Sequence, residues 1–160
     1  MSKIGIVTAA LAFVACGGSS SPATHFSATL SAANEPGSVT SSGTGSATYT
    51  VDGGTVTYTV TYSGLTANAT AGHIHVGPAG VNGAVTVPFT IPTPAAKSGT
   101  INAQFTAANI AAASTPDGGV SVTAGDYNGL LNLMRAGNTY TNIHTSTYPG
   151  GEIRGQNQPQ

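Results

Sequence analysis

Three of the four histidines in this 160-residue chain stand in two short motifs. His73 and His75 are two residues apart in the stretch AGHIHV, and His144 ends the stretch YTNIH. Side chains at i and i+2 of a β-strand lie on one face, about 6.6 Å apart, so two imidazoles can converge on one ion. Neutral imidazole nitrogens are common ligands of Cu(II) and Zn(II). We therefore predict a three-imidazole copper or zinc site, completed by water or a carboxylate.

The alternative is that these three histidines are structural. They would then hydrogen-bond across strands or to loop carbonyls and hold one face of the sheet together. The two interpretations differ in their pH dependence, because an imidazole binds a metal only when it is neutral. Metal binding is expected to weaken as the pH falls toward about 5.

The alternation of side chains adds further polar residues to this group. If Ile74, Ile143 and Ile153 point into the core, the residues one or three positions away on the same strands point outward. The outward set is then His73, His75, Tyr140, Asn142, His144, Glu152 and Arg154. A hairpin register that keeps Ile143 and Ile153 inside sets Asn142 opposite Arg154 and His144 opposite Glu152. Most of the unusual polar side chains would gather on one external sheet face.

Glu152 and Arg154 allow two interpretations. They could orient His144 from behind and attract anions toward an open metal position. They could instead form an ion pair, which is worth little when exposed, and this is the interpretation we favour. Asn142 belongs with them as a supporting residue. Tyr140 could stack beside the metal, although an aromatic residue on a sheet surface more often makes ordinary cross-strand packing.

Alternating apolar residues predict the strands that position these side chains. The expected strands are residues 25–31, 45–51, 55–62, 71–76, 84–91, 101–105, 139–145 and 151–156. Asp52-Gly53-Gly54, between the second and third strands, predicts a tight hairpin. About eight short strands indicate an all-β fold, an antiparallel Greek-key sandwich or a flattened barrel.

One segment has helical rather than alternating periodicity. Tyr127, Leu130, Leu131 and Met134 recur at helical spacing, and Gly137 follows as a terminator. Thr123 with Asp126 three residues later resembles a capping box. We predict one amphipathic helix over residues 124–135 that covers the edge or end of the sheets, and a weaker helical turn at 107–112.

The composition excludes several classes of protein. Charged residues make up 6% of the chain and the net charge is −1, so four Lys and Arg residues cannot form the basic patch of a nucleic-acid binder. With one cysteine, Cys16, no intramolecular disulfide is possible. The sequence contains no nucleophile–base motif, phosphate-binding loop or paired acidic motif.

The N-terminus predicts export. Residues 4–14 form an apolar run after Lys3 that is too short to span a bilayer. Small residues before Cys16, then glycines and serines, resemble a bacterial lipoprotein signal, which implies that Cys16 becomes an acylated first residue. Cleavage by an ordinary signal peptidase near Ala15 is the alternative. We expect a signal peptide at 1–15, a lipidated tether at 16–24 and membrane contact only through the lipid.

Several longer stretches resemble the CHRD (chordin-type) domain family. The most specific are AGHIHVGPAGVNGAV, YTNIHT and YPGGEIRGQ, supported by FSATLSAANEP and TYTVTYSGLT. The resemblance covers residues 25–157 and leaves 158–160 as a tail. It implies either a binding module like the repeats of vertebrate chordin, which bind growth factors, or a single exported bacterial domain. The histidine pattern with a later arginine is also similar to the copper site of copper/zinc superoxide dismutases.

Three functions follow from these observations. The first is an exported, envelope-anchored binding module that holds copper or zinc and engages an extracytoplasmic protein partner. The second is a copper redox enzyme directed at superoxide or oxygen. The third is a metal-free structural or adhesive domain that binds protein or glycan. We rank them in that order, and catalytic residues are not assigned.

Overall fold

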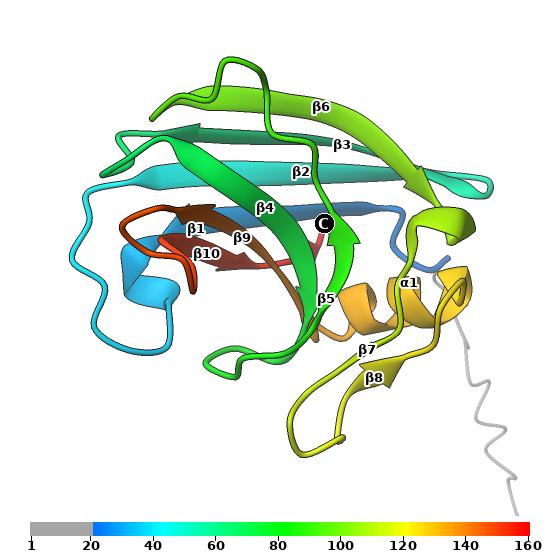
Figure 1. Cartoon of the computed structure of the whole chain (residues 1–160). Coiled ribbons are helices and arrows are strands. Elements are labelled where there is room, and N and C mark those ends of the chain that lie inside the picture. The colour runs from blue at the N-terminus through cyan, green and yellow to red at the C-terminus, as the bar shows by residue number, and fades with distance from the viewer. Residues whose placement is uncertain (1–20) are drawn as a thin grey trace, which may run out of the picture.

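The computed structural model describes residues 21–160, which form one large antiparallel sheet, a separate two-stranded ribbon and a short helix (Figure 1). The strands run β5-β4-β9-β10-β1-β2-β3-β6, and the sheet curls into a nearly closed barrel. Its strands are β1 (His25–Ser31), β2 (Thr44–Asp52), β3 (Thr55–Ser63), β4 (Ala69–Val76), β5 (Val85–Pro88), β6 (Gly99–Thr106), β9 (Thr139–Thr145) and β10 (Ile153–Gln156). The predicted all-β antiparallel architecture is confirmed, in its barrel form.

Three further strands are very short. β7 (Ala113–Ser114) and β8 (Ser121–Val122) form a separate ribbon, and β11 (Gln158–Pro159) pairs with β1 beside β10. Two 3₁₀ turns, η1 (Ala32–Asn34) and η2 (Ala107–Asn109), follow β1 and β6. The weaker helix expected at 107–112 is therefore limited to the three residues of η2.

The hairpin of β2 and β3 shows how alternation builds the core. Asp52 pairs with Thr55, and Gly53 between them has a φ of 57°, which side-chain-bearing residues rarely adopt. Along β3, Val56 and Val60 are fully buried, while the threonines between them point outward. The predicted tight turn and the predicted face of this strand are both confirmed.

The α-helix of residues 21–160, α1 (Tyr127–Arg135), lies against one end of the barrel (Figure 1). Its Leu130, Leu131 and Met134 side chains are buried in the core, as the periodicity predicts. The predicted start at residue 124 is wrong, because Gly125 has a φ of 76° and cannot lie in a right-handed helix. Asp126 is the true N-cap and accepts a hydrogen bond from the Gly129 amide at 2.8 Å.

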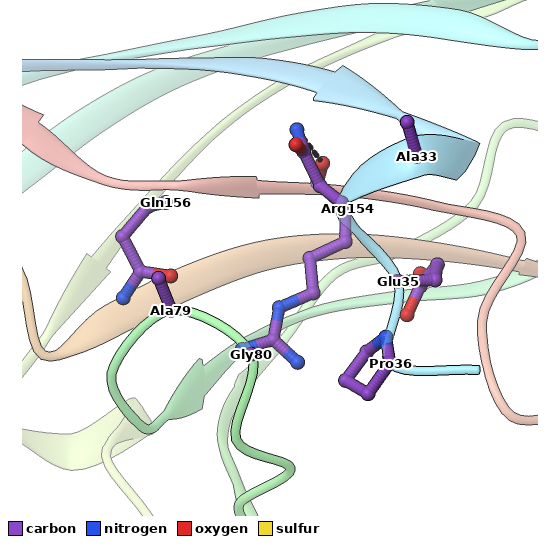
Figure 2. A pocket seen from close by; sticks show the side chains of 8 residues that line it. Ala33, Glu35, Pro36, Ala79, Gly80, Arg154 and Gln156 are labelled. Carbon is purple, nitrogen blue, oxygen red and sulfur yellow. Dashed lines mark hydrogen bonds between the residues drawn. The ribbon is translucent and has the colours of Figure 1, made fainter.

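Two connections, which we call the covering loops, fold over the outer side of β4, β9 and β10. They are residues 32–43, between β1 and β2, and residues 77–84, between β4 and β5. Figure 2 shows Glu35 and Pro36 from the first loop on one side of Arg154, and Ala79 and Gly80 from the second loop on the other. The outer side of these strands is therefore covered by main chain as well as by side chains.

Nothing in residues 21–160 forms a helix with the length and hydropathy required to cross a membrane. The predicted signal peptide and the lipidation site at Cys16 lie outside the described residues.

Candidate metal centre

The predicted face is assembled by the pairing of β4 with β9 and of β9 with β10. His73 lies opposite Asn142 and His75 opposite Tyr140, and Asn142 in turn lies opposite Arg154. The predicted register between Asn142 and Arg154 is confirmed. Ile74, Ile143 and Ile153, which alternate with these residues, are fully buried in the core.

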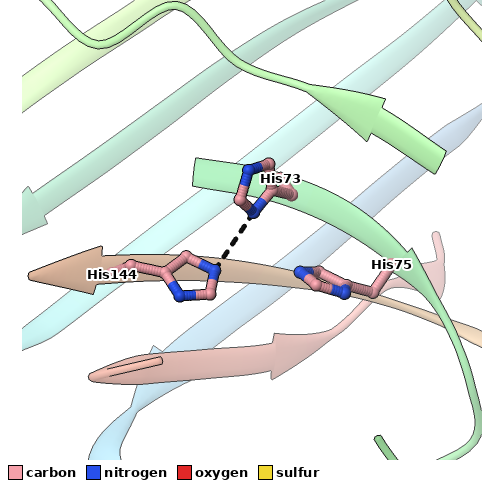
Figure 3. Close-up of side chains that lie close together, drawn as sticks. All are labelled: His73, His75 and His144. Atoms are coloured by element: carbon pink, nitrogen blue, oxygen red, sulfur yellow. Dashed lines mark hydrogen bonds between the residues drawn. The ribbon is translucent and has the colours of Figure 1, made fainter. Parts of the chain in front are cut away.

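The pairing brings the three histidines into one cluster (Figure 3). One nitrogen from each of His73, His75 and His144 lies within 4.8 Å of the other two. The closest pair is His73 Nδ1 and His144 Nε2, at 3.0 Å. Two nitrogens bound to one zinc ion at 2.0–2.1 Å lie about 3.3 Å apart in tetrahedral geometry, so this pair needs little movement to share an ion.

Backbone carbonyls fix the orientation of two of the rings. His75 Nδ1 lies 3.0 Å from the carbonyl oxygen of Gly83, and His144 Nδ1 lies 3.0 Å from that of Pro149. A carbonyl can only accept a hydrogen bond, so each Nδ1 is the donor. In the neutral ring the Nε2 atom then has a free lone pair, which is how metal-binding histidines are commonly oriented.

The Nε2 atoms differ in their partners. His75 Nε2 is buried and has no hydrogen-bond partner among residues 21–160. His144 Nε2 accepts from His73 Nδ1, so the proton between them occupies the place that a metal ion would take. Buried polar atoms without a partner are rare in native proteins, and this one lies in a cluster with two further imidazoles.

Burial keeps the cluster uncharged. It lowers the pKa of His73 to about 4, assisted by the charge of His144. It also lowers the pKa of His75 to about 4, partly opposed by the hydrogen bond to Gly83, and it lowers the pKa of His144. All three rings are therefore neutral at pH 7, which is the form that binds metal.

The predicted external face lies outside the barrel but is not open to solvent. His75 and His144 are 8% and 9% exposed, and Tyr140 and Asn142 are buried. The covering loops bury this face, because they place the carbonyl of Gly83 and the carboxylate of Glu35 against it. His73 is the most accessible of the three histidines.

A search against family models matches residues 26–157 to the CHRD domain. The chain belongs to the CHRD family. The match includes all three histidines and both covering loops, and it confirms the resemblance found in the sequence. Neither the curated proteins nor the solved structures contain a match to this chain.

In this CHRD domain Tyr140 packs directly against the histidine cluster. Its ring is nearly parallel to that of His75, with a tilt of 6° and a centroid distance of 4.7 Å. The Arg154 guanidinium lies on Tyr140 as well, 3.3 Å from the ring centroid. The Tyr140 hydroxyl also accepts a hydrogen bond from the Gly83 amide at 3.1 Å, so it steadies the residue whose carbonyl orients His75.

Asn142 connects the cluster to Glu35, a residue that the sequence did not place in the site. Asn142 Nδ2 donates to Glu35 Oε1 at 2.5 Å, while Asn142 Oδ1 is buried and has no partner in the described range 21–160. Burial raises the pKa of Glu35 to about 7, against the opposing effects of Arg154 and Asn142. The one signal in the sequence was its place in the CHRD-like stretch FSATLSAANEP, which carries no indication of a partner 107 residues away.

Glu152 has neither of the two predicted roles. Its carboxylate accepts hydrogen bonds from the Ser41, Thr66 and Thr145 hydroxyls at 2.6–2.8 Å and from the Thr66 amide at 2.7 Å. Burial raises the pKa of Glu152, but these hydrogen bonds outweigh it and hold the pKa below the usual value. It therefore secures a covering loop and the end of β9, and neither His144 nor Arg154 is its partner.

Proposed function

We propose that this CHRD domain is an exported binding module that holds one copper or zinc ion at His73, His75 and His144. The observation that supports this most strongly is the unpartnered Nε2 of buried His75, aimed by its Nδ1–H bond at a cluster with two further imidazoles. A metal ion at this position would satisfy that nitrogen, which favours a metal site over a purely structural cluster.

The donor set favours two metals. Imidazole nitrogens suit Cu(II) and Zn(II), whereas Mg(II) and Ca(II) prefer oxygen ligands. Three protein ligands leave a fourth coordination position, which can take water or a carboxylate from a partner. His73 is the most accessible ligand, so we place this position on its side of the cluster.

Export and anchoring belong to the same proposal. The sequence supports a signal peptide at 1–15 and a lipid on Cys16, followed by a tether to residue 24. Such a tether would hold the domain at the cell envelope, where an extracytoplasmic partner can reach the metal. Mass spectrometry of the mature protein tests this part, since an unmodified N-terminus downstream of Cys16 would exclude the lipid.

Calorimetric titration of metal-free protein with Cu(II) and Zn(II) at pH 7 tests the metal site. Wild type should bind one ion, and a His73→Ala, His75→Ala variant should bind at least about 100-fold more weakly, since even supporting residues are worth 10–100-fold. His25→Ala is the matched control, because His25 is exposed in β1, outside the cluster, and its loss should change nothing. Equal affinity in the wild type and the double variant would contradict the proposal.

A further inference from the structure

A cavity of about 340 Å³ is lined by Arg154, whose guanidinium lies on the Tyr140 ring, and by none of the three clustered histidines (Figure 2). Ala33 and Glu35 of one covering loop line one side, Ala79 and Gly80 of the other loop line the opposite side, and Arg154 of β10 lies between them. Cavities that bind small molecules begin at roughly 300 Å³. The space is therefore large enough for a small ligand.

Arg154 is a buried cation that makes no direct ion pair in the described part of the chain, residues 21–160. Its side chain is 1% exposed. It donates to the carbonyls of Pro78 (3.1 Å) and Val81 (2.8 Å) and to Asn82 Oδ1 (3.3 Å), which are all neutral acceptors. Within residues 21–160 no carboxylate lies within ion-pair distance of it; Glu35, which also lines the cavity and bonds to Asn142, acts on the guanidinium only through its charge at longer range. A buried charge is normally paired, because removing it from water is costly.

Donors to an anion are available around this charge. The Nε–H of Arg154 has no acceptor in the part of the chain that the structure describes. The backbone amides of Ala79 and Gly80 also lack one in that part, because the turn they form uses only the amide of Val81. Ala79 and Gly80 line the same cavity as the guanidinium, and backbone amides together with an arginine are donors that oxyanions accept.

We propose that this cavity binds a small oxyanion, a carboxylate or a phosphate, with Arg154 as its counter-charge. The guanidinium presents its donors in the planar geometry that both groups accept. This site is separate from the proposed metal site, and it is tested on metal-free protein so that the two proposals can fail independently.

The test is a titration of metal-free protein with inorganic phosphate and with acetate at constant ionic strength. The resonances of Arg154 Nε–H and of the Ala79 and Gly80 amides, followed by NMR, should shift saturably with a Kd of about 1 mM or below. Sodium chloride at the same ionic strength should leave them unchanged. If neither oxyanion produces a saturable shift, or if chloride produces the same one, the proposal is wrong.

Two variants connect that binding to the cavity. Ala33→Leu with Ala79→Leu narrows the cavity from both sides and should weaken oxyanion binding at least about tenfold. Ala108→Leu is the matched control, because Ala108 is exposed at the centre of the same Ala-Ala-Asn 3₁₀ turn in η2, away from the cavity. Unchanged binding in the double variant would overturn the assignment, without requiring a variant of the structurally important Arg154.

Discussion

Protons and metal ions compete for each of the three imidazoles, and burial sets the pH range in which protonation prevents metal binding. The pKa of about 4 for His73 and His75 means that protons compete for these rings only in acid. We therefore expect protonation of His73 and His75 to weaken Zn(II) binding mainly as the pH approaches 4, later than the sequence alone suggested. Competition titrations at several pH values measure this. A decline that already begins at pH 6.5 would contradict it.

The Tyr140 hydroxyl contributes to this site through Gly83. Tyr140→Phe keeps the ring stacked on His75 but removes the hydrogen bond to the Gly83 amide, so the carbonyl that orients His75 is less firmly held. We expect metal affinity to fall about tenfold, as for other residues that support a ligand. Tyr148→Phe is the control, since its hydroxyl bonds to Thr40 outside the cluster. Identical affinities in the two variants would show that Gly83 needs no such support.

The strands and the helix were largely predictable from the sequence, whereas the position of the covering loops over the histidine cluster was not. Alternation along β3 and β9 fixes which side chains face the core, because a strand places every second residue on the same side. The contacts of Arg154 with Pro78, Val81 and Asn82 join segments more than 70 residues apart, and nothing in a local pattern encodes them. The sequence therefore predicted the three histidines together but wrongly left their face open.

β10 depends on a glycine where it meets β1. A side chain at Gly155 would place its Cβ 2.4 Å from the Thr29 carbonyl oxygen, so the two strands could not stay this close. We expect Gly155→Ala to lower the free energy of unfolding by about 1–3 kcal/mol, the usual cost of overpacking. Gly150→Ala is the control, because a Cβ there meets nothing within 4 Å. Urea denaturation of both variants measures the effect, and equal stability would show that β1 and β10 can separate freely.

The stability of the metal-free domain combines two opposite pH effects. Unfolded histidines take up protons near pH 6.5, whereas folded His73 and His75 do so only near 4, so acidification favours unfolding in this range. Glu35 has the opposite effect on stability, because its carboxyl has a pKa of about 7 in the folded domain and 4.5 in the unfolded chain. Acidification through this range therefore favours the folded domain at Glu35.

We expect Glu35→Gln to remove the stabilisation that the wild type gains when Glu35 is protonated. Between pH 6.5 and 4.5 the variant should lose stability more steeply than the wild type, because only the histidine effect remains. Chemical denaturation at three pH values gives the slopes. Asp52→Asn, which removes an exposed carboxylate at the β2–β3 turn, is the control and should follow the wild type. A shallower slope in Glu35→Gln would mean that Glu35 is ionised in the folded domain.

The central claim, that His73, His75 and His144 bind one transition-metal ion, is tested most directly by anomalous diffraction from crystals of the copper- or zinc-loaded protein. We predict one peak at the metal absorption edge, 2.0–2.1 Å from His75 Nε2, from His144 Nε2 and from one nitrogen of His73. A fully loaded crystal with its peak at His25 or elsewhere, and with His73 still hydrogen-bonded to His144, would contradict the account.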